Sequence, residues 1–342
     1  MSQDIQKDAD TTSNGLSIHL EPVSDIGEKI LATKPKRTGF WWFILPHLAI
    51  ISVEVMYLGE NAIVLNSTID EFQLAFLSAL LAIPLLYMFA KLTKAPKKVL
   101  KRKETYWLVF AGILNVSVIQ VCLFMAVRYA KSLTLVGVLL PATTPFTCFI
   151  SWIVGPQKPS DNPVKATGLA IAIVGVAISI FYKPLVSDSI LAILCMIGVT
   201  LGFAIYILIQ SYLVKTCGMN SNWMCFYIYL YGVPPLFIFM LFRTHLWNFR
   251  ISYMGPILYN SVVIAFLSTL VYAWGNVNVQ GGTEITALYV MVAPIIHALY
   301  DFLFIDAQLE LLFALGVIFM FTGFVVSIIG SNKDKLKHNV CQ

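Results

Sequence analysis

The chain has 342 residues, of which 58% are hydrophobic and only 12% are charged, and its mean hydropathy is +0.79. Soluble domains carry about 25% charged residues, so this composition excludes a soluble protein and indicates an integral membrane protein. The net charge of +5 comes from basic residues beside apolar segments rather than from one binding face. This distribution argues against a nucleic-acid partner.

The first 39 residues are polar and mixed in charge, without the basic segment, short apolar core and cleavage site of a signal peptide. We expect them to form a disordered cytosolic tail. A helix that crosses a bilayer needs about 20 predominantly apolar residues, and ten segments meet this requirement. They cover residues 41–63, 72–92, 105–127, 133–154, 164–183, 189–214, 223–243, 254–275, 284–305 and 309–330. Residues 332–342 are predicted to be a second cytosolic tail.

Basic residues predict the orientation of these spans. If both tails are cytosolic, 18 Lys and Arg residues lie on the cytosolic side and 5 lie on the opposite side. Because cytosolic connections are enriched in Lys and Arg, both tails are expected in the cytosol. The strongest contribution comes from residues 91–103, which contain seven basic side chains.

Two thirteen-residue segments indicate an internal repeat. GLAIAIVGVAISI at 168–180 and GVIFMFTGFVVSI at 316–328 share two glycines, a serine and the last isoleucine at equivalent positions. Residues 40–184 and 185–331 are therefore predicted to be two five-helix repeats in an all-α membrane fold of ten transmembrane helices. Because five is an odd number, the two copies enter the membrane from opposite sides. Such inverted repeats are common in secondary transporters, and they also occur in some channels.

The first span carries the sharpest candidate for a functional residue. Glu54 lies near its middle, where an ionised acid costs roughly 2.5–3.5 kcal/mol on insertion scales. It is expected either to face a wet cavity, where it binds a solute's amino group or carries a proton, or to make a structural hydrogen bond. Tyr57 and Asn61 follow three and seven residues later, on roughly the same helical face. Glu60 lies nearer the outer end of the span and is expected to meet headgroup water.

Amide side chains interrupt two later apolar spans. Asn115 and Gln120 lie in the third span, and Gln210 lies in the sixth, one turn after Tyr206. Each buried amide needs a partner or water. These residues are expected either to line the cavity or to join helices, where such hydrogen bonds contribute about 0.6 kcal/mol on average.

A polar junction, WGNVNVQGGTE, separates the eighth and ninth spans and contributes Trp274 and Asn276 to the candidate cavity. The helix after this junction begins near Thr283, and the fourth span begins near Ser132 in the same way; both residues are suitable caps. The N-terminal end of a helix attracts anions, so both starts are candidates for a solute's carboxylate. The alternative for Glu284, in the first turn, is that it only matches the helix dipole.

The ninth span holds His297 and Asp301, which are four residues apart and share a helical face. Together with Glu54 they are candidates for a proton relay, because ionisable residues within membrane spans usually have a function. The alternative is a pair that only stabilises the helical bundle.

Several short motifs resemble those of one transporter family. They are His47-Leu48-Ala49 with Tyr57 and Gly59, Gln120 with Arg128-Tyr129, Lys165 with Gly168 and Gly175, Phe181-Tyr182-Lys183-Pro184, and Gln210-Ser211-Tyr212-Leu213-Val214-Lys215. In these motifs the chain resembles the EamA-like drug/metabolite transporter superfamily, and within it the plant nodulin-21-like or walls-are-thin-related proteins. Glu54 departs from that group, where a glutamine is usual. The resemblance implies a ten-helix exporter or facilitator of small metabolites, often amino acids, with helices 1, 3, 4, 6, 8 and 9 around a central cavity.

Together these features predict a multi-pass transporter that moves small polar metabolites, amino acids foremost, by alternating access. One alternative is a nucleotide-sugar or other metabolite exchanger of an organelle membrane, and another is a non-transporting scaffold or receptor. Catalytic motifs such as H-E-x-x-H and G-x-S-x-G do not occur in the sequence, so an enzyme is not expected.

The expected partners are a small polar solute and the lipid bilayer, and the oligomeric state is open between a monomer and a homodimer. No cofactor is expected. A metal site is not expected either, because the six cysteines lack the spacing of metal ligands. The plasma membrane is expected rather than an internal membrane.

Overall fold

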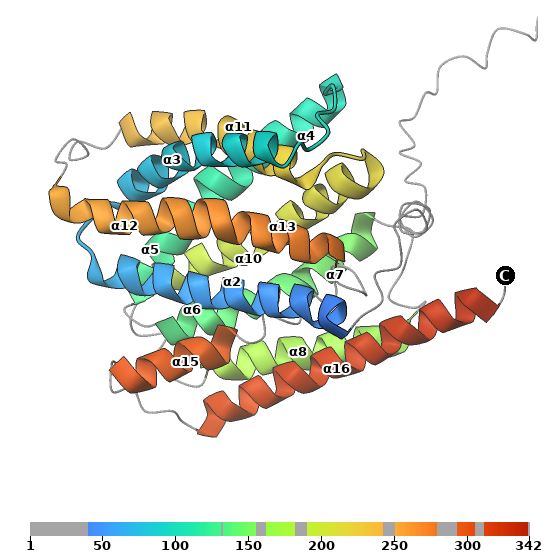
Figure 1. Ribbon diagram of the computed structural model, residues 1–342. Helices are drawn as coiled ribbons and strands as arrows, with labels where there is room; N and C mark the ends of the chain where they lie inside the picture. Colours follow the sequence, from blue (N-terminus) through green and yellow to red (C-terminus); the bar gives the residue numbers. More distant parts are fainter. Residues whose placement is uncertain are drawn as a thin grey trace, which may run out of the picture. The chain divides into compact units, whose positions relative to one another are not determined.

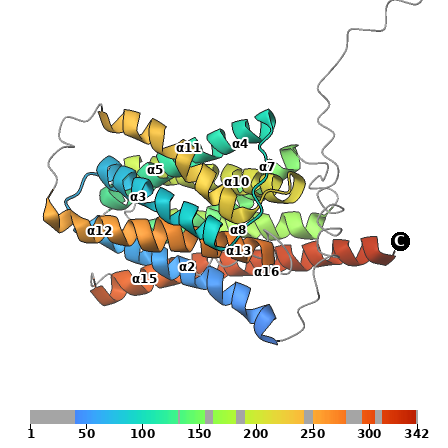
Figure 2. The same ribbon diagram turned by 45° about the horizontal axis from the view of Figure 1, so that its top comes forward.

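Helices form nearly all of the chain that the computed structural model describes, namely residues 40–130, 133–154, 162–181, 190–241, 250–278, 293–304 and 311–340. These residues all belong to one unit, Lys36–Gln342. Apolar segments become helical because lipid offers the backbone no hydrogen bonds, so every NH and CO group must be paired within its own segment. Figures 1 and 2 show most of these helices lying side by side.

The helices of the first half include one π-helical and one 3-10 segment. In chain order they are α2 (Phe40–Asn66), α3 (Glu71–Leu92), α4 (Arg102–Gly112), the π-helix η1 (Ile113–Ile119), α5 (Gln120–Ala130), α6 (Leu133–Leu139), the 3-10 turn η2 (Leu140–Ala142), α7 (Thr143–Val154) and α8 (Pro163–Phe181). Asp70 caps α3 by accepting a hydrogen bond from Phe72 N at 2.9 Å. The fourth predicted span is irregular at Pro141, because proline lacks the NH group that a continuous α-helix requires.

The second half repeats this pattern of long helices with local distortions. Its elements are α10 (Ile190–Ser211), the π-helix η4 (Tyr212–Thr216), α11 (Ser221–Leu241), the 3-10 turn η5 (Ile251–Tyr253), α12 (Met254–Tyr259), the π-helix η6 (Asn260–Ser268), α13 (Thr269–Asn278), α15 (Ala293–Phe304) and α16 (Leu311–Val340). The last helix continues well beyond its predicted end at residue 330. Neither proline nor glycine follows Gly330 to stop it.

The helices agree with the predicted spans within a few residues wherever both are described, except at the end of α16. Within the described ranges, five segments are long and apolar enough to cross a membrane: Glu71–Leu92, Arg102–Ala130, Ile190–Thr216, Ser221–Leu241 and Ile251–Gly275. Three shorter apolar helices are Pro163–Ser179, Ala293–Phe304 and Leu311–Ser327. The prediction of an all-helical fold with several membrane spans is thereby confirmed.

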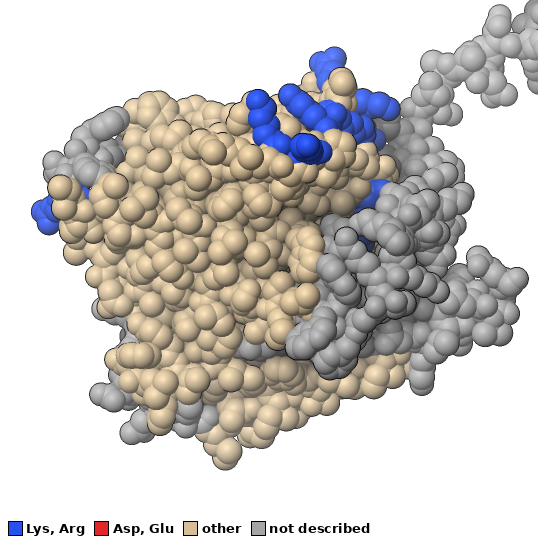
Figure 3. Space-filling view, in the orientation of Figure 1, with Lys and Arg blue, Asp and Glu red and all other residues tan. Residues whose placement is uncertain are grey.

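The connection between α3 and α4 lies at one end of the helical unit, against the junction of η4 and α11. There the indole Nε1 of Trp223 donates a hydrogen bond to Ala95 O at 3.0 Å, and Lys98 Nζ donates to the carbonyl of Cys217. Figure 3 shows Lys and Arg side chains gathered at one edge of a face that is otherwise mostly uncharged.

The start of α3 and the end of α11 lie at the other end of the helical unit. Arg128, in the last turn of α5, forms an ion pair with Glu71 at 3.1 Å. The hydroxyl of Tyr253, just before α12, lies 3.4 Å from Thr68 Oγ1 in the α2–α3 connection. Successive helices therefore run between two sets of connections, as they do in a multi-pass membrane protein.

This arrangement predicts that Lys94 and Arg250 lie on opposite sides of the membrane. Lys94 belongs to the connection after α3, at one end of the helical unit, and Arg250 precedes η5, at the other end. We expect Lys94→Cys to react with an impermeant maleimide only in inverted vesicles and Arg250→Cys only on intact cells. The wild-type chain measures the background from its own cysteines. Labelling of both variants from the same side would contradict the arrangement.

Glycines bring α8 and α16 together at backbone distance. A Cβ atom added at Gly175 would lie 2.5 Å from Met320 N and 2.7 Å from Gly316 O, which is closer than real Cβ atoms approach. Gly168 and Gly323 are enclosed by backbone atoms of the partner helix in the same way. Small residues let membrane helices approach closely, and the resulting van der Waals contacts hold the helices together.

The contacts of this helix pair are reciprocal with respect to the predicted internal repeat. Gly168 faces Gly323, and Gly316 faces Gly175. Gly316 and Gly323 lie 148 residues after Gly168 and Gly175. Exchanging the two halves therefore leaves this set of contacts unchanged. The two π-helices η1 and η6 show a related equivalence, since Ile113 and Asn260 begin them 147 residues apart.

Candidate solute site

Polar side chains of α2 are buried inside the helical unit. Glu54 is 4% exposed, Glu60 is 1% exposed and Asn61 is fully buried, whereas Tyr57 is half-buried. Burying such groups is costly unless they find partners, and more so for a charged carboxylate. Within the described part of the chain, the Glu54 side chain has no hydrogen bond, so its carboxylate remains available to a solute or a proton.

Asn61 contacts α15 through His297. Asn61 Nδ2 lies 3.0 Å from His297 Nε2, and His297 Nδ1 lies 2.8 Å from Ala293 O. Because a carbonyl oxygen can only accept, Nδ1 carries the ring proton in this arrangement, and Nε2 accepts the hydrogen bond from the amide. Asn61 Oδ1 is buried and has no hydrogen-bond partner among the described residues.

Asp301 is hydrogen-bonded to a different helix from the one that His297 bonds. Its Oδ1 accepts a hydrogen bond at 3.3 Å from the backbone NH of Leu133, the first residue of α6. The first NH groups of a helix have no partner within the helix, and a carboxylate placed there also interacts well with the helix dipole. Asp301 thus takes one NH group at the start of the fourth span, which was predicted as a candidate site for a solute's carboxylate.

Glu60 is joined to α5. Its Oε1 accepts a hydrogen bond from Gln120 Nε2 at 2.5 Å, while its buried Oε2 has no partner among the described residues. The expectation that Glu60 meets headgroup water was wrong. α2 packs against α5 along this stretch, so the side chain lies between helices rather than at the surface.

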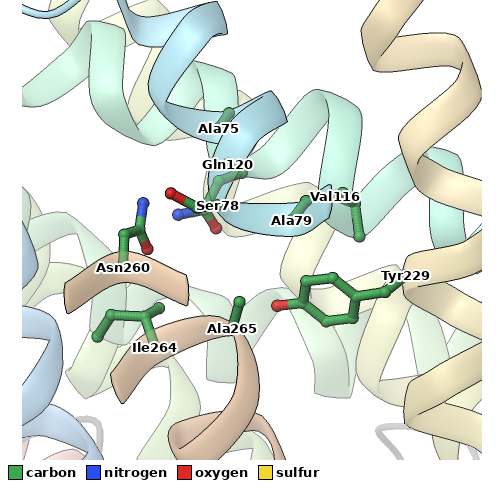
Figure 4. Close-up of a pocket in the computed structure, with 9 residues that line it drawn as sticks. All are labelled: Ala75, Ser78, Ala79, Val116, Gln120, Tyr229, Asn260, Ile264 and Ala265. Carbon is green, nitrogen blue, oxygen red and sulfur yellow. The ribbon is translucent and has the colours of Figure 1, made fainter. Parts of the chain in front are cut away.

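Gln120 also lines a small pocket between α3, α5, α11 and η6. The lining residues are Ala75, Ser78, Ala79, Val116, Gln120, Tyr229, Asn260, Ile264 and Ala265. Figure 4 shows the amides of Gln120 and Asn260 and the hydroxyls of Ser78 and Tyr229 turned toward the same space. The pocket has room for about one water molecule. This conformation is therefore closed to a metabolite at this position.

Aromatic hydroxyls from several helices lie near the same region. The Tyr57 side chain lies near Ser268, the last residue of η6. Tyr206 of α10 is close enough to Tyr57 and Tyr229 for electrostatic interaction, and Tyr229 lies 3.3 Å from Thr269 Oγ1. The predicted residues Tyr57 and Tyr206 thus come together, from spans one and six.

The remaining predicted residues lie in several environments. Gln210 is buried one turn after Tyr206, and Asn115 is half-buried within η1. Trp274 is 38% exposed on α13. The side chain of Asn276 lies outside the described residues, as do Ser132, Thr283 and Glu284.

Sequence reasoning missed Tyr229, Ser268 and Asn260. Asn260 was the easiest of these to predict, because an amide within an apolar span is a recognisable signal. It lies only six residues after the start of the eighth predicted span, where a polar residue is common near the membrane surface. Tyr229 gave no comparable signal in α11, which contains many aromatic residues.

Comparison with known proteins defines the class of the protein. Residues 60–181 match the EamA-like transporter family. A crystal structure of a protein that is 12% identical in sequence superposes with a TM-score of 0.57, over 86% of this chain and 99% of that chain. This likeness concerns the fold alone. None of the curated proteins matches the chain.

The chain is therefore a multi-pass membrane protein whose residues 60–181 are similar to the EamA-like transporter family. The matched segment begins at Glu60 and ends with α8, so it contains the Glu60–Gln120 pair. The description of this family names transporters, which agrees with the predicted class of activity. The match is to the family as a whole and does not select the plant nodulin-21-like subgroup.

Proposed function

We propose that this protein is a secondary transporter that moves small polar metabolites by alternating access, as a facilitator or an exporter. The observation that carries this proposal is the set of buried acids and amides on α2, within a unit of apolar membrane helices. Membrane spans rarely retain such groups without a function. The family match of residues 60–181 supports the same class of activity.

The proposed architecture has ten transmembrane helices in two inverted repeats, residues 40–184 and 185–331, with both tails in the cytosol of a plasma-membrane protein. The reciprocal contacts of α8 and α16 support it, and so do the equivalent positions of η1 and η6. A pseudo-two-fold axis between the halves would produce both features. In transporters of this plan, the two halves rock about a solute site near the middle of the membrane.

Amino acids are the solutes that fit the site best. Buried carboxylates can bind an ammonium group, and amide NH groups can bind a carboxylate. Nucleotide sugars carry phosphates, which proteins usually bind with several basic side chains. Among the Lys and Arg residues that the structure describes, only Lys165 is buried, and it lies in the first turn of α8.

The proposed cavity contains polar residues of spans one, three, six and eight. They are Glu54, Tyr57, Asn61, Asn115, Gln120, Tyr206, Gln210, Trp274 and Asn276. Glu54 is the member with a buried carboxylate and no hydrogen bond within the described residues. Its replacement therefore removes a charge or a proton site without breaking a described contact.

We expect Glu54→Gln to lower amino-acid flux about tenfold or more, because an amide cannot replace the charge-assisted hydrogen bond of a carboxylate. The measurement is efflux of labelled amino acids from oocytes at two external pH values, with surface expression quantified. Glu104→Gln is the matched control. Glu104 pairs with Lys98 at the end of the bundle, away from the cavity.

The outcomes separate the competing functions. Flux that is unchanged in Glu54→Gln would show that the site is wrongly assigned. A wild-type chain that reaches the surface but moves no amino acid would contradict the proposed solute class, and competition by nucleotide sugars would then favour the exchanger. If no metabolite moves, the scaffold or receptor alternative gains support.

A further inference from the structure

Two buried polar atoms beside the pocket lack partners within the described residues. They are the carboxylate oxygen Oε2 of Glu60 and the amide nitrogen Nδ2 of Asn260. Both side chains are more than nine-tenths buried. Native proteins pair nearly all buried polar groups, so an unpaired one calls for an explanation such as a ligand.

The two unpaired atoms are complementary in chemistry and come from different helices. Glu60, on α2, offers an acceptor, whereas Asn260, at the start of η6, offers a donor. Gln120 connects them, because it donates to Glu60 Oε1 and lines the pocket together with Asn260. A ligand that satisfies both groups must carry both a donor and an acceptor.

The helices that carry Gln120 and Asn260 are each distorted next to the amide residue. The π-helix η1 ends at Ile119, immediately before Gln120, and the π-helix η6 begins at Asn260. Such segments shift the backbone hydrogen bonds of a helix by one residue and are frequent at functional sites. Both segments border the pocket, through Val116 and through Ile264 and Ala265. Two equivalent helices of the proposed repeats therefore meet at the pocket with the same irregularity.

We propose that Glu60, Gln120 and Asn260 bind the main-chain groups of an amino acid, with its ammonium on Glu60 and its carboxylate on Asn260. Tyr229 and Ser78 provide further polar groups on the pocket wall. In an amino acid the two charged groups are attached to one carbon atom, which matches the pairing of a lone acceptor with a lone donor. The inference rests on the proposed transport function and adds Glu60 and Asn260 to the proposed cavity, next to Gln120.

The small size of the pocket means that the site is closed to the solute in this conformation. It has room for about one water molecule, so an amino acid enters only when α3, α11 and η6 move apart. Alternating access supplies such a movement. In the closed state, one water molecule can take the place of the solute's polar groups beside Asn260.

The test uses the purified full chain in proteoliposomes. Labelled forms of the twenty protein amino acids identify the solute that moves fastest in the wild type. Two analogues of that solute, one without the amino group and one without the carboxylate, then compete for its transport. We expect each analogue to compete about tenfold or more less effectively than the complete amino acid.

Asn260→Ala and Glu60→Gln should each raise the half-saturating concentration of that solute about tenfold or more. Asn260→Ala also removes an unpaired buried donor, so its melting temperature should not fall below that of the wild type. A structural amide would behave in the opposite way. Asn222→Ala is the matched control, because Asn222 lies at the end of the bundle and bonds Thr93.

The possible outcomes test three separate claims, namely the binding site, the recognition of the main-chain groups and the solute class. Transport by the wild type with unchanged affinity in both variants would overturn the binding site and leave the transport function intact. Equal competition by either analogue would overturn the recognition of both main-chain groups. A wild type that moves none of the twenty amino acids would overturn the proposed solute class and the inference with it.

Discussion

Gly175→Leu should leave little correctly folded protein, because it places a side chain where two helix backbones are in contact. The new Cβ would lie 2.5 Å from Met320 N, which belongs to the backbone of α16 and cannot move aside like a side chain. Overpacking costs typically about 1–3 kcal/mol, and a clash with a backbone belongs at the upper end. This is a large share of the roughly 5–15 kcal/mol that stabilises a folded protein.

The measurement is the fraction of fluorescently tagged protein that stays monodisperse in detergent after heating. Gly198→Leu is the matched control, since Gly198 also lies within a long helix, α10, and a Cβ there meets no atom within 4 Å. We expect this control to retain nearly the wild-type melting temperature. Equal losses in both variants would show that leucine is harmful for a reason other than the α8–α16 contact.

Asp301→Leu should also lower the yield of folded protein, by a different mechanism. The carboxylate accepts a hydrogen bond from the backbone NH of Leu133 at the start of α6. Leucine cannot accept it, and leaving a buried NH group without a partner costs about 1–3 kcal/mol. Asp301→Asn keeps an oxygen acceptor at this position. We therefore expect asparagine to restore most of the stability that leucine removes.

Flux measurements on Asp301→Asn decide between anchoring and proton relay. If Asp301 anchors α6, the asparagine variant keeps its flux and the response of that flux to external pH. If Asp301 carries protons, asparagine abolishes the pH response, because an amide does not ionise near neutral pH. A folded Asp301→Asn variant without flux would thus contradict the anchoring role that the geometry supports.

The course of the helices could be predicted from the sequence because the rule that governs it is local. About 20 apolar residues must form a helix in lipid wherever they occur. The irregular turn at Pro141 in the fourth span has an equally local cause, because proline lacks a backbone NH group. The π-helices could not be predicted in this way. Neither ILNVSVI in η1 nor NSVVIAFLS in η6 contains a residue that requires this distortion.

The candidate site was only partly predictable, because its partners are distant in sequence. Glu54 and Asn61 were recognised as polar residues in an apolar span, and both are buried. The partner of Asn61 is His297, 236 residues away, and no local pattern identifies such a pair. The burial of Glu60 depends in the same way on the packing of α5 against α2, which brings Gln120 to it.

The glycine-lined contact of α8 and α16 also limits how the molecule can change shape. Backbones that interlock at this distance cannot slide along each other without a collision at every turn, since Gly168, Gly175, Gly316 and Gly323 each face atoms of the opposite helix. We therefore expect α8 and α16 to keep their register and to move as one rigid pair, while other helices change position relative to them. A crosslink between these two helices should therefore leave transport running, whereas one across the pocket between α3 and η6 should stop it.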